Sequence, residues 1–206
     1  MPTIYVVDTG LSNVYSLVNA LEFLDAKVNV ITEAQDLRNA RKIILPGVGS
    51  FHAASKRLSE SGLGSAIVEE VIGKQAHIFG ICLGMQLLSE ASHEHGLNKG
   101  LGLITGEVTR FDVEQGAKQV QNVGFNSINW ISDSRLSSGL NPNTSFYFTH
   151  SYKLLPETTS ETVGTSINGV PFTSVVDNGI NVFGTQFHPE KSQRPGLKII
   201  ENYINI

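Results

Sequence analysis

The chain has 206 residues, a length that can bury one sizeable core. Hydrophobic residues make up 40% of it and charged residues 17%, which is typical of a soluble globular protein and excludes a disordered chain. The formal net charge is −4, and Lys and Arg are scattered, so a nucleic-acid-binding surface is not expected.

The single cysteine excludes an internal disulfide and is typical of a reducing compartment. The first residues lack the basic region and the apolar run of a signal peptide. No apolar run approaches the about 20 residues that span a bilayer. We therefore expect a cytoplasmic protein that does not enter a membrane.

The first half of the chain alternates short apolar runs with helical patterns. Strands are predicted at residues 4–7, 27–32, 42–45 and 76–81, and a helix at 83–89. Such alternation predicts an α/β fold with an open, mostly parallel sheet flanked by helices on both faces. Another helix lies between the first two strands, capped by Ser12 or Asn13, because apolar residues recur at helical spacing at Val14, Leu17, Val18, Leu21 and Leu24.

The second half has shorter apolar segments, separated by Gly, Asn and Pro. We expect strands that add to the same sheet with mostly antiparallel pairing. A final helix at 195–203 would turn Leu197, Ile200 and Ile204 inward. The added strands are predicted at 107–111, 145–149, 171–175 and 181–186. Because the sequence shows no repeat or linker, the chain is predicted to form one domain over residues 1–206.

The segment around Cys82 has the pattern of a nucleophile elbow. A strand pattern ends at Ile81 and a helical pattern begins at Leu83. Gly80 and Gly84 flank the cysteine at the spacing of the G-x-S-x-G turn, with a thiol in place of the hydroxyl. Such a turn presents the nucleophile at the carboxyl edge of the sheet, where ligands bind in open α/β folds. A lone cysteine is more often an inert core residue, but the paired glycines favour catalysis.

A thiol nucleophile needs a base, and the base needs an orienting group. His188 follows an apolar strand pattern, and Glu190 comes two residues later. On a backbone held extended by Pro189, both side chains would share one face, so the carboxylate could orient the imidazole. The other histidines are less suited: His77 is predicted in a strand, His52, His93 and His95 on the surface, and His150 either in the structure or lining the site.

Three segments together resemble class I glutamine amidotransferases: ILPGVGSF, GICLGMQLL and FGTQFHPEKS. The resemblance covers nearly the whole chain, in order. More narrowly, the chain resembles the family of glutaminase subunits of imidazole glycerol phosphate synthase, from histidine biosynthesis. The segments that carry this narrower resemblance are VVDTGLSNVYSL, PGVGSF, Met85-Gln86, YFTHSY and Lys191-Ser192.

The resemblance implies a role for each matching residue. Cys82 would attack the carboxamide of L-glutamine and form a thioester, His188 would transfer protons, and Glu190 would orient His188. It implies no cofactor and no metal. A peptide flip in the PGVG loop, which glycine makes sterically easy, would complete an oxyanion hole. The oxyanion and substrate-binding positions would be Gly47, Val48, Gly49, Leu83 and Gln86.

The ammonia that this reaction releases would have to reach a second active site directly, because at neutral pH it is mostly ammonium, a poor nucleophile. No residues remain in the chain for a synthase domain. The resemblance implies a heterodimer with a cyclase subunit, which is a (β/α)₈ barrel that makes imidazole glycerol phosphate and AICAR. Candidate interface residues are Asn13, Asn122, Phe125, Tyr147 and Lys191.

One segment departs from the family pattern. Where the family has P-H-M-G-W-N facing the synthase, residues 121–126 read QNVGFN. A paralogous amidotransferase that supplies another synthase, such as one modifying a nucleotide sugar for surface polysaccharide, would show this departure. The remaining hypotheses are a hydrolase or peptidase of similar fold with an elbow cysteine, and an inactive binding subunit. Labelling of Cys82 by an electrophilic glutamine analogue would separate these two from the amidotransferases.

Overall fold

The computed structural model describes residues 3–11, 14–142 and 144–206. Within these ranges the largest sheet has eight strands in the order β2-β1-β3-β4-β14-β13-β12-β9. The strands from β2 to β14 run parallel, and β13, β12 and β9 pair antiparallel. The strands are β1 Thr3–Val7, β2 Lys27–Ile31, β3 Lys42–Gly47, β4 His77–Cys82, β9 Asn129–Trp130, β12 Thr162–Asn168, β13 Val170–Asp177 and β14 Val182–Thr185.

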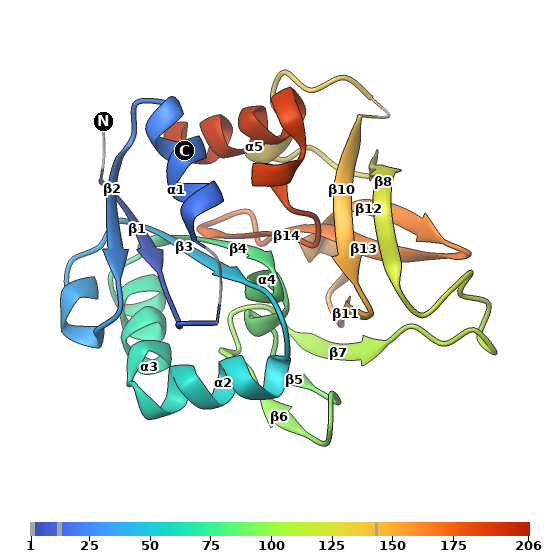
Figure 1. Ribbon diagram of the computed structural model, residues 1–206, viewed down its shortest axis with the longest axis horizontal. Helices are drawn as coiled ribbons and strands as arrows, with labels where there is room; N and C mark the ends of the chain where they lie inside the picture. The colour runs from blue at the N-terminus through green and yellow to red at the C-terminus, as the bar shows by residue number, and fades with distance from the viewer. Residues whose placement is uncertain (1–2, 12–13, 143) are drawn as a thin grey trace.

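Helices cover both faces of the parallel part (Figure 1). One face packs against α1 (Tyr15–Phe23) and α5 (Gln193–Asn205), and the other against α2 (Phe51–Glu60) and α3 (Leu63–Val68). Successive strand residues point to opposite faces, so alternate β1 residues enter different cores. The predicted fold class, an open and mostly parallel sheet flanked by helices with added antiparallel strands, is confirmed.

The C-terminal helix is tied to the centre of this sheet by Tyr203. The phenol is fully buried, and its hydroxyl donates to the carbonyls of Ile43 at 2.7 Å and His77 at 2.9 Å, on β3 and β4. The buried Lys42 ammonium donates to the carbonyls of Tyr203, at 3.4 Å, and Ile204. Desolvation lowers the pKa of Lys42. The end of α5 is therefore held by side chains of the sheet.

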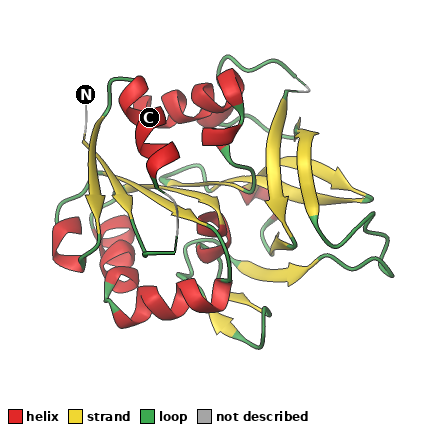
Figure 2. Cartoon of the chain, in the orientation of Figure 1, coloured by secondary structure: helices red, strands yellow, loops and turns green. Residues whose placement is uncertain are grey.

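The second half differs from the expectation in how its strands pair. In the described part of the chain, β8 (Asn122–Ser127) pairs only with β10 (Ser145–His150), and a separate sheet has the order β11-β7-β5-β6. The expectation that strands 107–111 and 145–149 add to the main sheet was therefore wrong. Figure 2 shows these strands beside the helical part of the molecule. The smaller sheet consists of β5 Ala91–Ser92, β6 Asn98–Lys99, β7 Gly106–Arg110 and β11 Tyr152–Pro156.

The predicted segment at 181–186 is β14, and its pairing was only partly anticipated. It pairs antiparallel with β13 but parallel with β4. Both of its faces are buried, so polar and apolar residues do not alternate along it. The sequence therefore does not indicate whether this strand pairs parallel or antiparallel. This parallel pairing places the residues after β14 at the same sheet edge as the end of β4.

The helix boundaries agree with the patterns to within a few residues. The helix after β4 is α4 (Leu83–Leu87), and the final helix begins at Gln193 with Ile200 and Ile204 buried and Leu197 partly buried. The first helix begins at Tyr15, and its expected caps, Ser12 and Asn13, lie outside the described residues. No described helix is both long and apolar enough to span a membrane. Short helical turns complete the structure: η1 Ala34–Leu37, the π-helical η2 Glu69–Gly73, η3 Arg135–Ser137, η4 Thr159–Glu161 and η5 Pro189–Lys191.

Candidate active site

Cys82 lies on a strained turn between β4 and α4. Its φ of 54° and ψ of −109° are unfavourable for a side chain with a Cβ atom. A Cβ built on Gly80 would lie 2.7 Å from the Gly84 carbonyl oxygen, and one built on Gly84 would lie 1.7 Å from the Leu45 carbonyl oxygen. The two flanking glycines are therefore required by close backbone approach, as an elbow requires.

The PGVG loop lies directly beside this turn. It continues β3, which pairs with β4 so that Gly47 stands opposite Cys82. A Cβ on Gly47 would come within 2.9 Å of the Leu83 Cβ, whereas Gly49 has open space and a φ of +92°. Close packing therefore requires the first glycine, and backbone conformation requires the second. Val48 between them is 38% exposed.

His188 lies just after the strand that neighbours the Cys82 strand. It follows β14, the parallel neighbour of β4, and is 2% exposed. Its Nδ1 lies 2.8 Å from Oε1 of Glu190. The expected extended backbone between them was wrong: Pro189–Lys191 forms a 3₁₀ turn with proline at its start. Proline's fixed φ suits the first position of a helical turn, and this turn brings the carboxylate to the ring.

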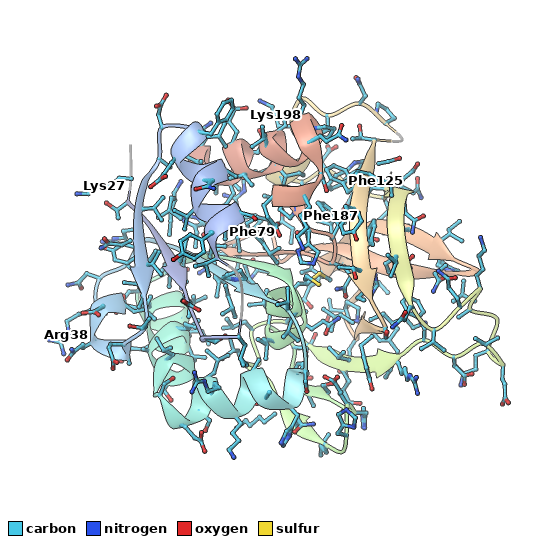
Figure 3. The ribbon with its side chains drawn as sticks, viewed as in Figure 1. Lys27, Arg38, Phe79, Phe125, Phe187 and Lys198 are labelled. Carbon is cyan, nitrogen blue, oxygen red and sulfur yellow. The ribbon has the colours of Figure 1, made fainter. Side chains whose placement is uncertain are left out.

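Backbone contacts with β10 fix the position of His188. Its N–H donates to the Tyr147 carbonyl at 2.9 Å, and its carbonyl accepts from the Ser192 hydroxyl at 2.6 Å. The same hydroxyl oxygen accepts from the Tyr147 N–H at 2.9 Å. Next to the histidine, Phe187 stacks on Phe146 with ring centroids 4.2 Å apart, and Figure 3 shows it in the interior of the molecule. These contacts therefore hold the backbone that carries the imidazole.

The surroundings of His188 favour its protonated form. Burial lowers the pKa of His188, but its interactions with Cys82 and Glu190 outweigh burial and raise that pKa to about 10. At neutral pH the His188 ring therefore carries a proton beside the Cys82 side chain. This arrangement supplies a nucleophile and an acid from the same pair of residues.

A cavity of about 200 Å³ opens beside Cys82. It is smaller than the roughly 300–1,000 Å³ sites that hold drug-sized ligands, and it suits a small polar molecule. Among the described residues, no group of three or more His, Cys, Asp and Glu side chains is placed to hold a metal ion. The cavity is lined by Val48, Gly49, Cys82, Leu83, Gln86, Glu94, Thr149, His150, Ser151 and Tyr152.

Several of these lining residues were not singled out in the sequence. Thr149, Ser151 and Tyr152 belong to the segment that resembles the family, but they carry no local pattern of their own. Glu94 lies in the loop between β5 and β6, and its carboxylate accepts from the Phe51 N–H at the start of α2. That contact ties the loop to the end of the PGVG segment. No periodicity or motif could have found it, because the two segments meet only in the fold.

His150 proves to be both structural and part of the cavity wall. Its Nδ1–H donates to the Tyr152 carbonyl at 2.7 Å, so its Nε2 accepts from the Asn122 amide at 3.0 Å. Burial, opposed by the hydrogen bond to the Tyr152 carbonyl and assisted by the charge on His188, lowers the pKa of His150 to about 4. The ring is therefore neutral at pH 7. His77 lies in β4, and His52, His93 and His95 are exposed, as expected.

The candidate interface residues divide into two groups. Phe125 is 52% exposed and contacts the Tyr147 ring edge-on, with centroids 5.6 Å apart, on the β8–β10 pair labelled in Figure 1. Lys191 is also exposed. Asn122 is only 4% exposed, and its side chain serves the His150 network. Asn13 lies outside the described residues.

The family relationship follows from comparison with known proteins. The family model described as "Glutamine amidotransferase class-I" matches residues 5–206. The chain belongs to this family. It is 37% identical over 203 residues to imidazole glycerol phosphate synthase subunit HisH of Leptospira interrogans, covering 98% of both chains. It is 39% identical over 204 residues to HisH of Geobacillus sp. (strain WCH70), covering 98% of this chain and 95% of that protein.

Solved structures with low sequence identity share the fold. The structure of PurLQS from Thermotoga maritima matches with a TM-score of 0.76 at 18% identity, over 99% of this chain and 98% of that one. A putative GMP synthase protein from Thermoplasma acidophilum matches with a TM-score of 0.72 at 18% identity, over 100% of this chain and 93% of that one. At this identity the likeness concerns the fold alone.

Proposed function

We propose that Cys82, His188 and Glu190 together hydrolyse L-glutamine to glutamate and ammonia. The observation that carries this proposal is the buried His188–Glu190 pair, which follows β14 and interacts with an elbow cysteine on the adjacent strand. The sulfur attacks the carboxamide carbon, and the C=O electrons move to oxygen. When the intermediate collapses, the C–N bond breaks and His188 protonates the departing ammonia. His188 then takes a proton from water, which hydrolyses the thioester.

The developing oxyanion needs N–H donors beside Cys82. The Leu83 N–H begins α4, and the PGVG loop supplies a second donor from the segment Val48-Gly49 after a peptide rotation. The positive φ of Gly49 and the absence of any atom within 4 Å of its Cβ position support such a rotation. Gln86 and the cavity wall hold the rest of the substrate.

The ammonia serves the synthesis of imidazole glycerol phosphate. Full-length relatives at 37% and 39% identity support this assignment: the chain is the glutaminase subunit of imidazole glycerol phosphate synthase, in histidine biosynthesis. Its partner is a cyclase subunit, folded as a (β/α)₈ barrel, that uses the ammonia to form imidazole glycerol phosphate and AICAR. One amidotransferase domain over residues 1–206 forms a heterodimer with it in the cytoplasm. The exposed β8–β10 face, with Phe125, Tyr147 and the nearby Lys191, is the docking surface.

Replacing the nucleophile tests the chemistry. Cys82→Ala in the assembled synthase is expected to abolish glutamine-dependent product formation, because no thioester can form. Product formation from added ammonium salts should persist, since the cyclase is unchanged. Chromatographic detection of the product under both conditions is the measurement. If both activities disappear in a correctly assembled complex, Cys82 has a structural role instead.

The acceptor is tested separately. Addition of the histidine-pathway cyclase with its ribonucleotide ligand is expected to raise glutamine turnover, because docking completes the oxyanion hole. Glutamate release by the wild-type chain, with and without the cyclase, measures this. An active chain that this cyclase does not stimulate would instead supply another synthase, as the unusual segment 121–126 would then indicate.

A further inference from the structure

The Cys82 sulfur accepts a hydrogen bond that the thioester mechanism leaves unexplained. Its donor is Nε2 of Gln186, 3.7 Å from Sγ. Gln186 is completely buried and lies just after β14, two residues before His188. A buried amide destabilises the folded state unless its hydrogen bonds are made. The neighbours of Gln186 show how they are made.

The orientation of the Gln186 amide is determined by a second glutamine. Nε2 of Gln86 donates at 3.0 Å to the Tyr152 carbonyl, which can only accept. The same nitrogen donates at 3.0 Å to Oε1 of Gln186. Because Gln86 presents its nitrogen, Gln186 must present its oxygen to it. The amide of Gln186 therefore turns its N–H toward the sulfur.

The chain of hydrogen bonds continues to the strand β8. The Tyr152 carbonyl also accepts from Nδ1 of His150, and Nε2 of His150 accepts from Asn122. Oδ1 of Asn122 accepts from the Asn126 amide at 2.8 Å. Side chains from four separate segments thus hold one donor against the nucleophile. Such a network resists reorientation of any one member, since each lost contact leaves a buried polar group unpaired.

We propose that Gln186 is a positioning residue that holds the Cys82 side chain and stabilises its negative charge, with Gln86 fixing the direction of the donor. A thiolate accepts a hydrogen bond more strongly than a thiol, so this donor favours the ionised form. The proposal rests on the proposed function, because it takes Cys82 as the nucleophile. It assigns to Gln186 no contact with the substrate.

Other ionisable groups face the same sulfur and stay unchanged in the experiment. His188, oriented by Glu190, approaches from the segment after β14. His150 on β10 and Glu94 in the loop between β5 and β6 line the same cavity as Cys82. A difference between wild type and a Gln186 variant therefore isolates the amide.

The test is the pH dependence of Cys82 alkylation by iodoacetamide in the full chain. Gln186→Met keeps the approximate shape but removes the donor. The pH at half-maximal alkylation rate should rise by about one unit, equivalent to tenfold less thiolate at a given lower pH. In the assembled synthase, kcat for glutamine should fall about tenfold with KM within about twofold, since a smaller fraction of Cys82 is in the reactive thiolate form while the substrate contacts are unchanged.

The matched control is Asn202→Leu, which also removes a buried amide. Asn202 donates to the carbonyls of Leu136 and Ser138 at 2.8 Å, beneath α5 and away from the cavity. It should lower thermal stability and leave the alkylation profile at its wild-type position.

Gln186→Glu, which keeps the acceptor for Gln86, is the second variant should Gln186→Met fail to fold. Its profile should move in the same direction, because a carboxylate opposes a thiolate.

A double variant tests the role of Gln86. Once Gln186 is Met, Gln86→Met should not shift the alkylation profile further, because its partner is already absent. An additive shift would overturn the role of Gln86 as the orienting residue. A wild-type profile and wild-type kcat in the Gln186 variants would overturn the whole proposal. In that case alkylation of Cys82 and glutamine turnover would persist, so the proposed function would stand. If the wild-type chain itself shows no glutamine turnover, that result would instead count against the proposed function.

Discussion

At the scale of single residues, the site depends on contacts with backbone atoms that cannot move aside. Gly84 faces the Leu45 carbonyl of β3, and Gly47 faces the first turn of α4. Both neighbours belong to a buried sheet and to the helix packed on it. A clash there cannot be relieved by a change of rotamer, because the nearest atoms are the Leu45 carbonyl for Gly84 and the Leu83 Cβ and Gly84 N for Gly47, which no side-chain rotation moves.

Gly84→Ala is accordingly expected to lower the free energy of unfolding by at least about 3 kcal/mol, since the new Cβ would overlap the Leu45 carbonyl. Urea denaturation followed by circular dichroism measures the change. Gly73→Ala is the control: nothing lies within 4 Å of its Cβ position. Its effect should stay within about 1 kcal/mol. Equal stability of the two variants would contradict the elbow geometry.

His150 makes stability depend on pH. Its pKa is about 4 in the folded chain, against an ordinary value of 6.5. Between these values the unfolded state binds more protons, so the free energy of unfolding falls as the pH falls from 6.5 to 4. The loss attributable to this residue is about 3 kcal/mol. The raised pKa of His188 keeps that residue protonated in the folded chain throughout this window, so it adds little to the slope below pH 6.5.

His150→Gln should therefore flatten the slope of stability against pH between 4 and 6.5, although its stability at pH 7 is lower because the new side chain packs differently. Urea denaturation across this range gives the slope for each protein. His52→Gln changes an exposed histidine and should leave the wild-type slope intact. A His150→Gln slope as steep as that of the wild type would rule out the linkage.

At the scale of elements, α5 positions the strands that carry the site. The hydroxyl of Tyr203, a residue of this helix, bridges carbonyls of β3 and β4. These two strands end in the PGVG loop and in Cys82. The helix thus holds together the pair of strands whose ends must stay aligned. This contact lies at the opposite ends of those strands from the cavity, so it supports the site without touching it.

Tyr203→Phe should cost about 1–3 kcal/mol, because two buried carbonyls lose a donor while the ring remains. Thermal and urea denaturation measure the loss, and iodoacetamide labelling of Cys82 should continue below the transition. Tyr5→Phe, at a half-buried tyrosine on β1, is the matched control and should lose less. An equal loss in both variants would mean that the bridging hydroxyl contributes no more than a surface one.

At the scale of the whole molecule, the second half of the chain presents an exposed strand pair beside the site. Phe125 and Val123 are more than half exposed on β8, while the neighbouring Asn122 and the β10 residue His150 enter the buried network. The outer face of β8 is thus available to a partner, while its inner face is hydrogen-bonded to His150 in the cavity wall. Tyr147 adds its ring to the outer face and its backbone to His188.

Phe125→Ala should weaken the complex with the synthase subunit roughly tenfold or more in Kd, because a large apolar side chain is lost from the proposed docking surface. Titration calorimetry or surface plasmon resonance measures this. Iodoacetamide labelling of the free chain should be unchanged. Ile72→Ala, which truncates another exposed apolar side chain, serves as the control and should bind normally. Wild-type affinity of the Phe125 variant would place the interface elsewhere.

Much of the fold was predictable because its signals are local. Short apolar runs predicted β1, β3 and β4, alternation predicted β2, and helical spacing predicted α1 and α5, since each pattern reports burial of its own segment. The short strands β5, β6 and β9 were missed because two residues carry no period. The separate pairing of β8 with β10 was missed because partner choice depends on the path of the whole chain.

The sequence by itself determined Cys82, its flanking glycines and the His188–Glu190 pair as candidates, because residue type and spacing over a few positions carry that information. Only the tertiary structure showed that Glu190 reaches His188 through a 3₁₀ turn, that Asn122 is buried, and that Gln186 donates to the sulfur. The physical reason is that these contacts join segments brought together by strand order. Gln186 and Cys82 are far apart in the chain, and they meet because β14 lies parallel to β4.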